Sequence, residues 1–340
     1  MKKFISMMCI VLTFATLFCA CNGEEPVETQ PVTESVTTAE PTEETTKAPA
    51  PVVKTTYIDF DGTVKAKPTE VKAMKISAFH QNEELGGKTV QVVYKHAQGG
   101  CIMGDYLITC MNAPAVKGVY PQMVCIVKSD LKTGKIIEKS KGMPLGHGND
   151  ATYNPDDNVL VIADCGGNGH NKLHILDPET LELKETKTVS GSGTTICAID
   201  YDTVNKRYVA VGAQNDYVHI YNRNFQLLKE FKGYGMTQGD PYKGEFSEQG
   251  IKTDGKYLYI LEWHGGPNWA EKNSTTESLV RANILVTDLA TGKHVATVET
   301  GIKRELEYMV YHNGKIYIGC NNIHWTGMEF YKVEITTTKS

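Results

Sequence analysis

The feature that most constrains this chain is a pattern that returns five times along its length. Each copy holds an apolar run, a turn rich in Gly, Asp or Asn, and then a strongly β-forming run. Successive second runs begin about 50 residues apart, a period typical of folds that repeat one structural unit. The second runs cover residues 106–110, 160–164, 208–212, 258–262 and 316–320.

A further strand follows in the copies. It covers residues 125–127, 173–176, 218–221 and 283–286, and an Asp or Asn closes each run before a turn that leads to a fourth strand. Four strands per period of this length are typical of a β-propeller blade, whose strands are covered on both faces. The pattern predicts an all-β, five-bladed β-propeller with four-stranded antiparallel blades over residues 56–340.

The fifth copy lacks a fourth strand after residues 330–335, so a strand from the other end of the chain should complete it. Residues 56–64 and 89–94 are the two candidates for this closing strand. The alternative architecture is an open β-sandwich.

The start of the chain is typical of an exported protein. Lys2 and Lys3 precede a short apolar run that ends in a small residue, which predicts a signal peptide over residues 1–20. The pair Ala20-Cys21 resembles the end of the lipobox of bacterial lipoproteins. That resemblance implies lipidation of Cys21 and a lipid anchor in the cell membrane, with the protein on its extracytoplasmic face. The alternative is an ordinary cleaved signal.

Residues 21–55 have a different composition. From residue 22 this segment is rich in Thr, Glu, Pro and Val and contains no aromatic residue. Such a segment cannot bury enough apolar surface to fold, so we expect a disordered tether between the anchor and the propeller.

Charge argues against nucleic acid as a partner. The whole chain carries −5, and the seven Glu and two Lys of the tether account for much of that charge. The remaining folded part is close to neutral and has no basic stripe, which phosphate binding requires. We therefore expect no nucleic-acid binding.

Cysteine use indicates core packing more than metal binding. Six cysteines lie beyond the signal and anchor, and none forms a Cys-x-x-Cys pair, so the sequence predicts no zinc site. Most lie in apolar strand patterns, where cysteine acts as a small hydrophobe. One or two disulfide bridges are compatible with export. The six are Cys101, Cys110, Cys125, Cys165, Cys197 and Cys320.

The repeat also places side chains at the ring axis, because the first strand of each propeller blade lines the central channel. Counting back from each second run puts one residue of every copy at a single level, and four of the five are polar. The level holds Gln98, Asn149, Cys197, Gln249 and Glu307, with His96, His147, Asp150, Glu248 and Glu305 nearby. Such a ring could bind a divalent cation or a sugar, or act by acid–base chemistry. Alternatively, it binds channel water and neighbouring backbone.

Aromatic residues mark a second candidate surface. All three tryptophans fall in the segments that follow the fourth and fifth second runs, where loops are expected. Exposed Trp beside His would suit a stacking surface for carbohydrate, peptide or a surface protein, and the alternative is that the rings cap a blade edge. The residues are Trp263, His264, Trp269, His324 and Trp325.

Two local resemblances bear on function. Residues 161–180 resemble the YVTN-type propeller repeat. Short phrases around Gln98 and around Glu305-Leu306-Glu307-Tyr308 resemble the glutaminyl cyclase family, whose plant-type members are five-bladed propellers. The second resemblance implies Glu305 and Glu307 as acid–base residues.

A ligand-binding lipoprotein is the leading functional prediction. The rival is an extracytoplasmic enzyme, either a glutaminyl cyclotransferase or a glycoside hydrolase. A glycoside hydrolase would need two facing carboxylates. The candidates for these carboxylates are Asp150, Glu248, Glu305 and Glu307.

Overall fold

The computed structural model describes the chain from residue 63 to residue 338, except residues 73, 166–170, 194, 214–215, 235–245, 266–278, 323 and 325. Side chains of residues 63–65, 246–248, 264, 265, 279–281 and 336–338 are also outside the description. The predictions that fall on Cys21, Trp269 and Trp325, and on the side chains of Glu248 and His264, therefore lie outside the described residues.

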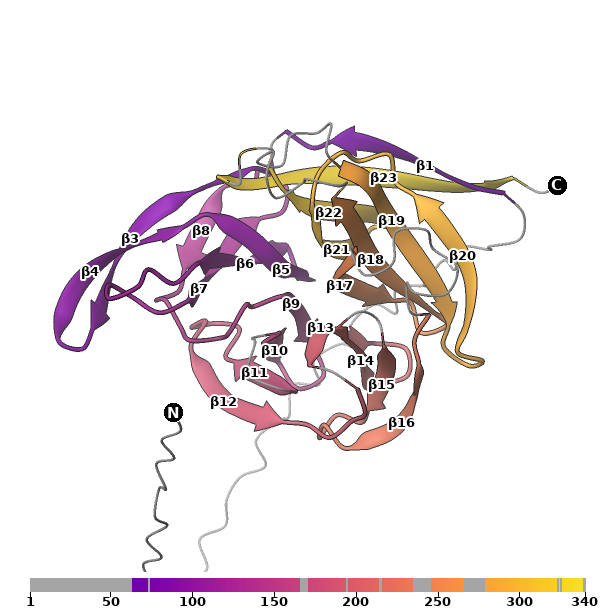
Figure 1. Cartoon of the computed structure of the whole chain (residues 1–340), viewed down its shortest axis with the longest axis horizontal. Coiled ribbons are helices and arrows are strands. Elements are labelled where there is room, and N and C mark those ends of the chain that lie inside the picture. The colour runs from indigo at the N-terminus through magenta and orange to yellow at the C-terminus, as the bar shows by residue number, and fades with distance from the viewer. Residues whose placement is uncertain are drawn as a thin grey trace, which may run out of the picture. The chain divides into compact units, whose positions relative to one another are not determined.

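Five antiparallel blades of four strands form a propeller ring, as the repeat predicts (Figure 1), and a short strand, β2 (Ile76–Ser77), also pairs with the fifth blade. Each of the first four blades runs from an innermost to an outermost strand in chain order. The first two blades are β5 (His96–Met103), β6 (Tyr106–Ala113), β7 (Met123–Asp130) and β8 (Ile136–Lys139), then β9 (Asp150–Asn154), β10 (Val159–Ala163), β11 (Lys172–Leu176) and β12 (Leu183–Thr188).

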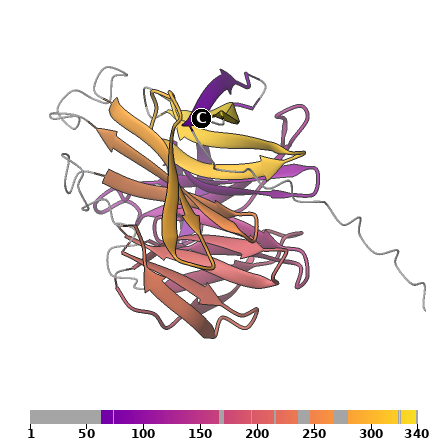
Figure 2. The same ribbon diagram turned by 90° about the vertical axis from the view of Figure 1, so that its right-hand side faces the viewer.

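The remaining blades repeat this order, and Figure 2 shows them from the side. Among the described residues, no helix is long and apolar enough to cross a membrane. The third blade is β13 (Ile196–Asp202), β14 (Arg207–Gly212), β15 (Tyr217–Tyr221) and β16 (Leu227–Lys232). The fourth is β17 (Phe246–Thr253), β18 (Tyr257–Gly265), β19 (Leu279–Asp288) and β20 (Lys293–Glu299). The fifth starts with β21 (Leu306–His312), β22 (Lys315–Asn321) and β23 (Gly327–Thr338).

The N-terminal strand closes the ring. β1 (Thr63–Glu70) pairs with β23 along eight positions and is the outermost strand of the fifth blade, where Figure 1 shows it beside β23. A closing strand was predicted, but its position was only approximate, since just Thr63 and Val64 belong to the predicted 56–64. The polar sequence of β1 includes Pro68 and carries no strand-like apolar pattern, because an edge strand buries little surface.

The other candidate for closure is wrong. Residues 89–94 lie in β4 (Lys88–Tyr94), which pairs with β3 (Phe79–Leu85) as a separate hairpin. The Glu83 carboxylate fixes this hairpin to the first blade by accepting hydrogen bonds from the Tyr94 hydroxyl at 2.9 Å and the Gly142 amide at 2.8 Å. The apolar residues of β4 are buried against the first blade and not within a closing sheet.

Five hydrophobic clusters account for the stability of the ring. Each cluster joins side chains of two neighbouring blades, so every blade interface is apolar and closed. The inner strands of each blade, such as β10 and β14, do not alternate between buried and exposed residues, because both of their faces are covered by neighbouring blades. The outermost strands, such as β12, are largely exposed. This arrangement holds the innermost strands at a fixed height around the axis.

Candidate functional site

The first strands of four blades carry a β-bulge at the same height. The pairing register shifts between Ala97 and Gly100, Ile196 and Ala198, Glu248 and Ile251, and Leu306 and Tyr308. A bulge leaves extra residues outside the ladder and re-aims their side chains. The bulged residues include Gln98, Cys197, Gln249 and Glu307. The level predicted by the repeat is therefore confirmed for these four blades, and Asn149 occupies it directly before β9 in the remaining blade.

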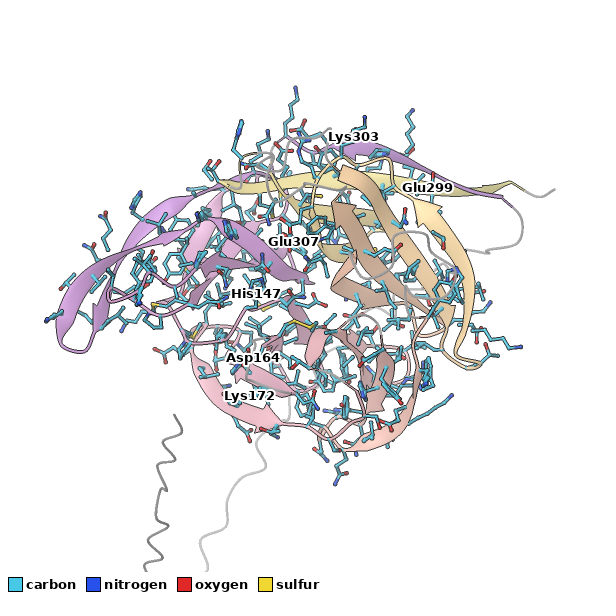
Figure 3. The ribbon with its side chains drawn as sticks, viewed as in Figure 1. His147, Asp164, Lys172, Glu299, Lys303 and Glu307 are labelled. Carbon is cyan, nitrogen blue, oxygen red and sulfur yellow. A yellow bond between two sulfur atoms is a disulfide. The ribbon has the colours of Figure 1, made fainter. Side chains whose placement is uncertain are left out.

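We call this end of the ring, where each first strand begins and each second strand ends, the bulge face. Pairs such as Ala97 with Met111 and Leu306 with Cys320 confirm that both strand ends meet there. Figure 3 shows Glu307 and His147 near the middle of the ring and Lys303 at its outer rim. The polar residues of the bulges thus gather near the ring axis.

The bulged side chains are buried, yet several of their oxygens lack partners. Gln98 is 5% exposed, Gln249 7% and Glu307 0%. Among the described residues, no hydrogen bond reaches Gln98 Oε1, Gln249 Oε1 or Glu307 Oε2. The amide nitrogen of Gln98 donates to the Ala97 carbonyl at 2.8 Å, which fixes the orientation of that side chain. Buried polar atoms without partners are rare in native proteins and call for an explanation.

Two carboxyl groups and one amide form the centre of this cluster. Asn321 Nδ2 donates to Glu305 Oε2 at 3.1 Å and to Glu307 Oε1 at 2.5 Å, and the two glutamates are hydrogen-bonded to each other. A bond between two carboxyl groups requires a proton on one of them. Burial raises the pKa of Glu305 to about 7, and burial together with Glu305 raises the pKa of Glu307 well above its ordinary value.

A second tier lies two residues earlier along the first strands and is less buried. His96, His147 and Glu305 are half-buried, whereas Gln98, Asn149 and Glu307 are buried. Burial lowers the pKa of His96 to about 4, with Lys95 and His147 adding to the effect, and burial also lowers the pKa of His147. Both imidazoles are thus neutral at neutral pH.

His147 is held by residues of the first blade. Its Nδ1 lies 2.9 Å from Gln122 Nε2, and Asn112 Nδ2 donates to its carbonyl at 3.0 Å. Asn112 and Asn321 occupy equivalent positions at or next to the end of the second strand of their blade. Each bonds to the next blade around the ring, Asn112 to His147 and Asn321 Oδ1 to the Ala97 amide at 2.9 Å. These asparagines link neighbouring blades.

Asp150, which the sequence suggested as an acid or base, bonds to the backbone of the ring. Its Oδ2 accepts hydrogen bonds from the amides of Ile199 at 3.1 Å and Ile251 at 3.0 Å, and its Oδ1 accepts from Ala151 at 2.9 Å. The carboxylate therefore joins the second, third and fourth blades across the axis. A Cβ on Gly99 would lie 2.4 Å from the Asp150 Cα, so the approach of β5 to β9 here requires glycine. These contacts indicate a structural role for Asp150.

One of the ring positions is occupied by a disulfide. Cys197 is bonded to Cys165 and joins the third blade to the end of the second strand of blade two. The sequence allowed one or two bridges, and one is present, whereas the other four cysteines are buried free thiols. At this level Asn149 donates to the Cys197 carbonyl at 3.0 Å, so the second and third blades are doubly connected.

The expected aromatic surface is not formed by Trp263. Its side chain is 6% exposed and packs in the cluster between the fourth and fifth blades. Strand β18 runs on to Gly265, so Trp263 lies within a paired strand and not in the loop after it. His324 is exposed on the bulge face, and its amide donates to Asn322 Oδ1 at 3.1 Å.

Three residues of the site were not among the predicted ones. Asn321 bridges the two glutamates, and Asn112 and Gln122 hold His147. The position of Asn112 and Asn321 at the end of equivalent second strands is the signal that could have found them. Gln122 lies in a loop, and no repeat position marks it.

The described residues contain no group of three or more His, Cys, Asp or Glu side chains placed to hold a metal ion. The predicted divalent cation thus receives no support from this part of the chain. Glu305 and Glu307 are in direct hydrogen-bond contact, whereas glycoside hydrolases separate their carboxyl groups by about 5–10 Å. This pair therefore lacks the geometry of a glycoside hydrolase.

The fold and these residues define a five-bladed β-propeller with a polar cluster at one end of its axis. No family model matches the chain, and no curated protein matches it by sequence. The crystal structure of Myxococcus xanthus glutaminyl cyclase is similar, with 11% identity and a TM-score of 0.49 over 82% of this chain and 100% of that one. Kuenenia stuttgartiensis hydrazine synthase is similar at 15% identity and a TM-score of 0.39, over 71% of this chain and 78% of that one.

Proposed function

We propose that this protein is an exported, membrane-anchored binding protein that holds a small polar ligand at the bulge face of its propeller. The observation that carries the proposal is the set of unpartnered oxygens on Gln98, Gln249 and Glu307. They come from the first, fourth and fifth blades, which are consecutive around the ring. A purely structural ring satisfies its buried polar atoms, as Asp150 does, so the unsatisfied ones support a binding role.

Two features support export and anchoring: the N-terminal sequence and the disulfide of the propeller. The apolar run before Cys21 supports a signal peptide, and the resemblance to a lipobox supports lipidation of that cysteine. The Cys165–Cys197 disulfide suits an oxidising compartment outside the cytoplasm. Carbohydrate, peptide and surface protein all remain compatible with this placement.

The test is a ligand screen that compares matched variants. Gln98→Met and Gln249→Met each remove an unpartnered oxygen from the cluster, while Gln91→Met makes the same change on the exposed face of β4. We expect a ligand that raises the Tm of the wild-type protein and of Gln91→Met, with a shift at least halved in the two ring variants. If the ligand raises the Tm of Gln98→Met and Gln249→Met as much as that of the wild type, it binds elsewhere and the proposal is overturned.

A catalytic alternative is favoured by one observation, the hydrogen-bonded pair of Glu305 and Glu307. A carboxyl group whose pKa lies near 7 can donate and accept protons at neutral pH. Turnover of N-terminal glutaminyl peptides by the wild-type protein, lost in Glu305→Gln but retained in Glu185→Gln on exposed β12, would support this alternative. Absence of turnover together with ligand binding would favour the binding protein.

A further inference from the structure

Three of the described buried atoms without a hydrogen-bond partner at the bulge face are of one kind. Gln98 Oε1, Gln249 Oε1 and Glu307 Oε2 are hydrogen-bond acceptors, and the side chains that carry them are each more than nine-tenths buried. No unsatisfied donor nitrogen accompanies them on these three side chains. A ligand that completes this set must therefore supply donors, and it gains nothing by bringing acceptors of its own.

The charges of the cluster also favour a ligand that supplies donors, because the described residues place no cation beside its carboxyl groups. Among the described residues, no lysine or arginine is close enough to alter the pKa of Glu305 or Glu307. The nearby Arg304 is instead paired with Glu329 at 2.9 Å. Two buried carboxyl groups without a cation must keep a proton between them, because an unpaired buried charge is costly.

The described polar groups at the bulge face come from four blades. The fifth blade supplies Asn321, which bonds to both glutamates, the first blade Gln98, His96 and Lys95, the second blade Asp150 and His147, and the fourth blade Gln249 and Glu262. The side chain of Glu248 lies outside the described residues. Burial of both imidazoles opposes their protonation, and Lys95 affects His96 and not the glutamates. None of the described groups supplies a positive charge to the pair.

We propose that this centre binds its ligand through a primary ammonium group, which takes the place of the proton shared by Glu305 and Glu307. The ammonium brings three N–H donors and no acceptor, which matches three unsatisfied oxygens. As it enters, one proton leaves the carboxyl pair for solvent, the two carboxylates then carry two negative charges, and the ammonium neutralises one of them. No bond to carbon forms or breaks. This inference rests on the proposed binding function and adds the chemical class of the ligand.

Neutral polyols fit less well. A sugar hydroxyl donates one hydrogen bond but also presents acceptor lone pairs, and these would meet an environment that already consists of acceptors. A quaternary ammonium carries the charge but no N–H donor. Neutral donors and quaternary ammonium ions can therefore be used as probes that test hydrogen bonding and charge separately.

The experiment is isothermal titration calorimetry of the purified full-length protein with propylammonium, N-propylacetamide and tetramethylammonium as probes. Titrations at pH 6 and pH 8.5, in buffers of different ionisation enthalpy, count the protons exchanged. We expect propylammonium to bind at least tenfold more tightly than the other two. It should release more protons at pH 6 than at pH 8.5, and its apparent affinity should rise with pH, because the ammonium displaces a proton from the carboxyl pair.

Variants identify the groups responsible. Glu307→Gln should abolish the proton release and weaken propylammonium binding at least tenfold, while Glu84→Gln on the exposed face of β3 should change neither. Circular dichroism of each variant checks that the fold is retained. Binding of propylammonium without proton release at pH 6, or equal binding of N-propylacetamide, would overturn the inference.

The two proposals fail in different ways. If propylammonium does not bind, but the screen finds a ligand whose effect depends on Gln98 and Gln249, the ammonium inference is wrong and the binding function stands. If no ligand depends on those residues and propylammonium does not bind either, the proposed function itself is wrong.

Discussion

At the scale of single residues, burial decides the chemistry of the site. Among the described residues, Glu305 and Glu307 share one amide donor, Asn321, and have no cation beside them. Asp150, as buried as Glu307, receives three backbone amides. Both carboxyl oxygens of Asp150 therefore accept hydrogen bonds, whereas Glu307 Oε2 has no hydrogen-bond partner among the described residues.

The pH dependence of stability follows from Glu305. Its pKa is raised from 4.5 to about 7 in the folded state, so folding favours the protonated form. The resulting stability is fully present below about pH 4.5 and is lost as pH rises through 7, for a total on the order of 3 kcal/mol. Urea unfolding at pH 5 and pH 8 should show this decrease for the wild type and a smaller one for Glu305→Gln. An equal decrease in the variant would contradict the assignment.

At the scale of elements, apolar strands were predictable and polar ones were not. The second strands β6, β10, β14, β18 and β22 all lie at the predicted second runs, because both faces of each strand are buried and select apolar residues. The closing strand β1 has one partner and a polar sequence, so no pattern distinguished it. Trp263 was assigned to a loop because the sequence does not reveal that β18 extends to Gly265.

Loss of β1 should open the ring. A chain that begins at Val71 exposes the edge of β23 and gives up eight paired positions, a loss on the order of 4 kcal/mol from hydrogen bonds alone. We expect its thermal unfolding to begin at a lower temperature and to be less cooperative than that of a chain beginning at Thr63. Addition of a peptide with the sequence of residues 63–70 should restore part of the difference. An unchanged Tm would show that β1 is dispensable.

At the scale of the whole molecule, the repeat predicted the number of blades and the common level of the residues at the ring axis, but not the bulges that hold four of them. It could not predict which members of that level would pair. Cys165 and Cys197 are 32 residues apart, and only the packing of the second blade against the third brings them together. Blade packing likewise brings Asn321 of the fifth blade to the Ala97 amide of the first blade, a contact that the sequence could not predict.

The disulfide should contribute to the stability of the whole ring. Closing a loop of this length contributes about 3–4 kcal/mol by the loop-entropy relation. Replacing both Cys165 and Cys197 by Ser should lower the free energy of unfolding by about that amount, as chemical denaturation can measure. The matched substitution Cys110→Ser tests a buried free thiol instead. A reducing agent should destabilise the wild type and leave the double variant unchanged.

Anchoring can be tested on intact cells. If Cys21 carries the lipid, Cys21→Ser should move the protein from the membrane fraction to the soluble fraction, whereas Cys101→Ser should not. Incorporation of a labelled fatty acid should disappear in the first variant only. Retention of Cys21→Ser in the membrane fraction would contradict the lipoprotein assignment.

The position of β1 also has a mechanical consequence. The chain enters β1 at Thr63, opposite Thr338, and the strand ends at Glu70 beside Tyr331, near the bulge face. The N-terminal end of β1 therefore lies at the face opposite the bulge face. A pull on Thr63, resisted by a partner held at the bulge face, would act along β1. It would load the ladder with β23 in shear, so that all eight pairs share the force instead of opening one after another.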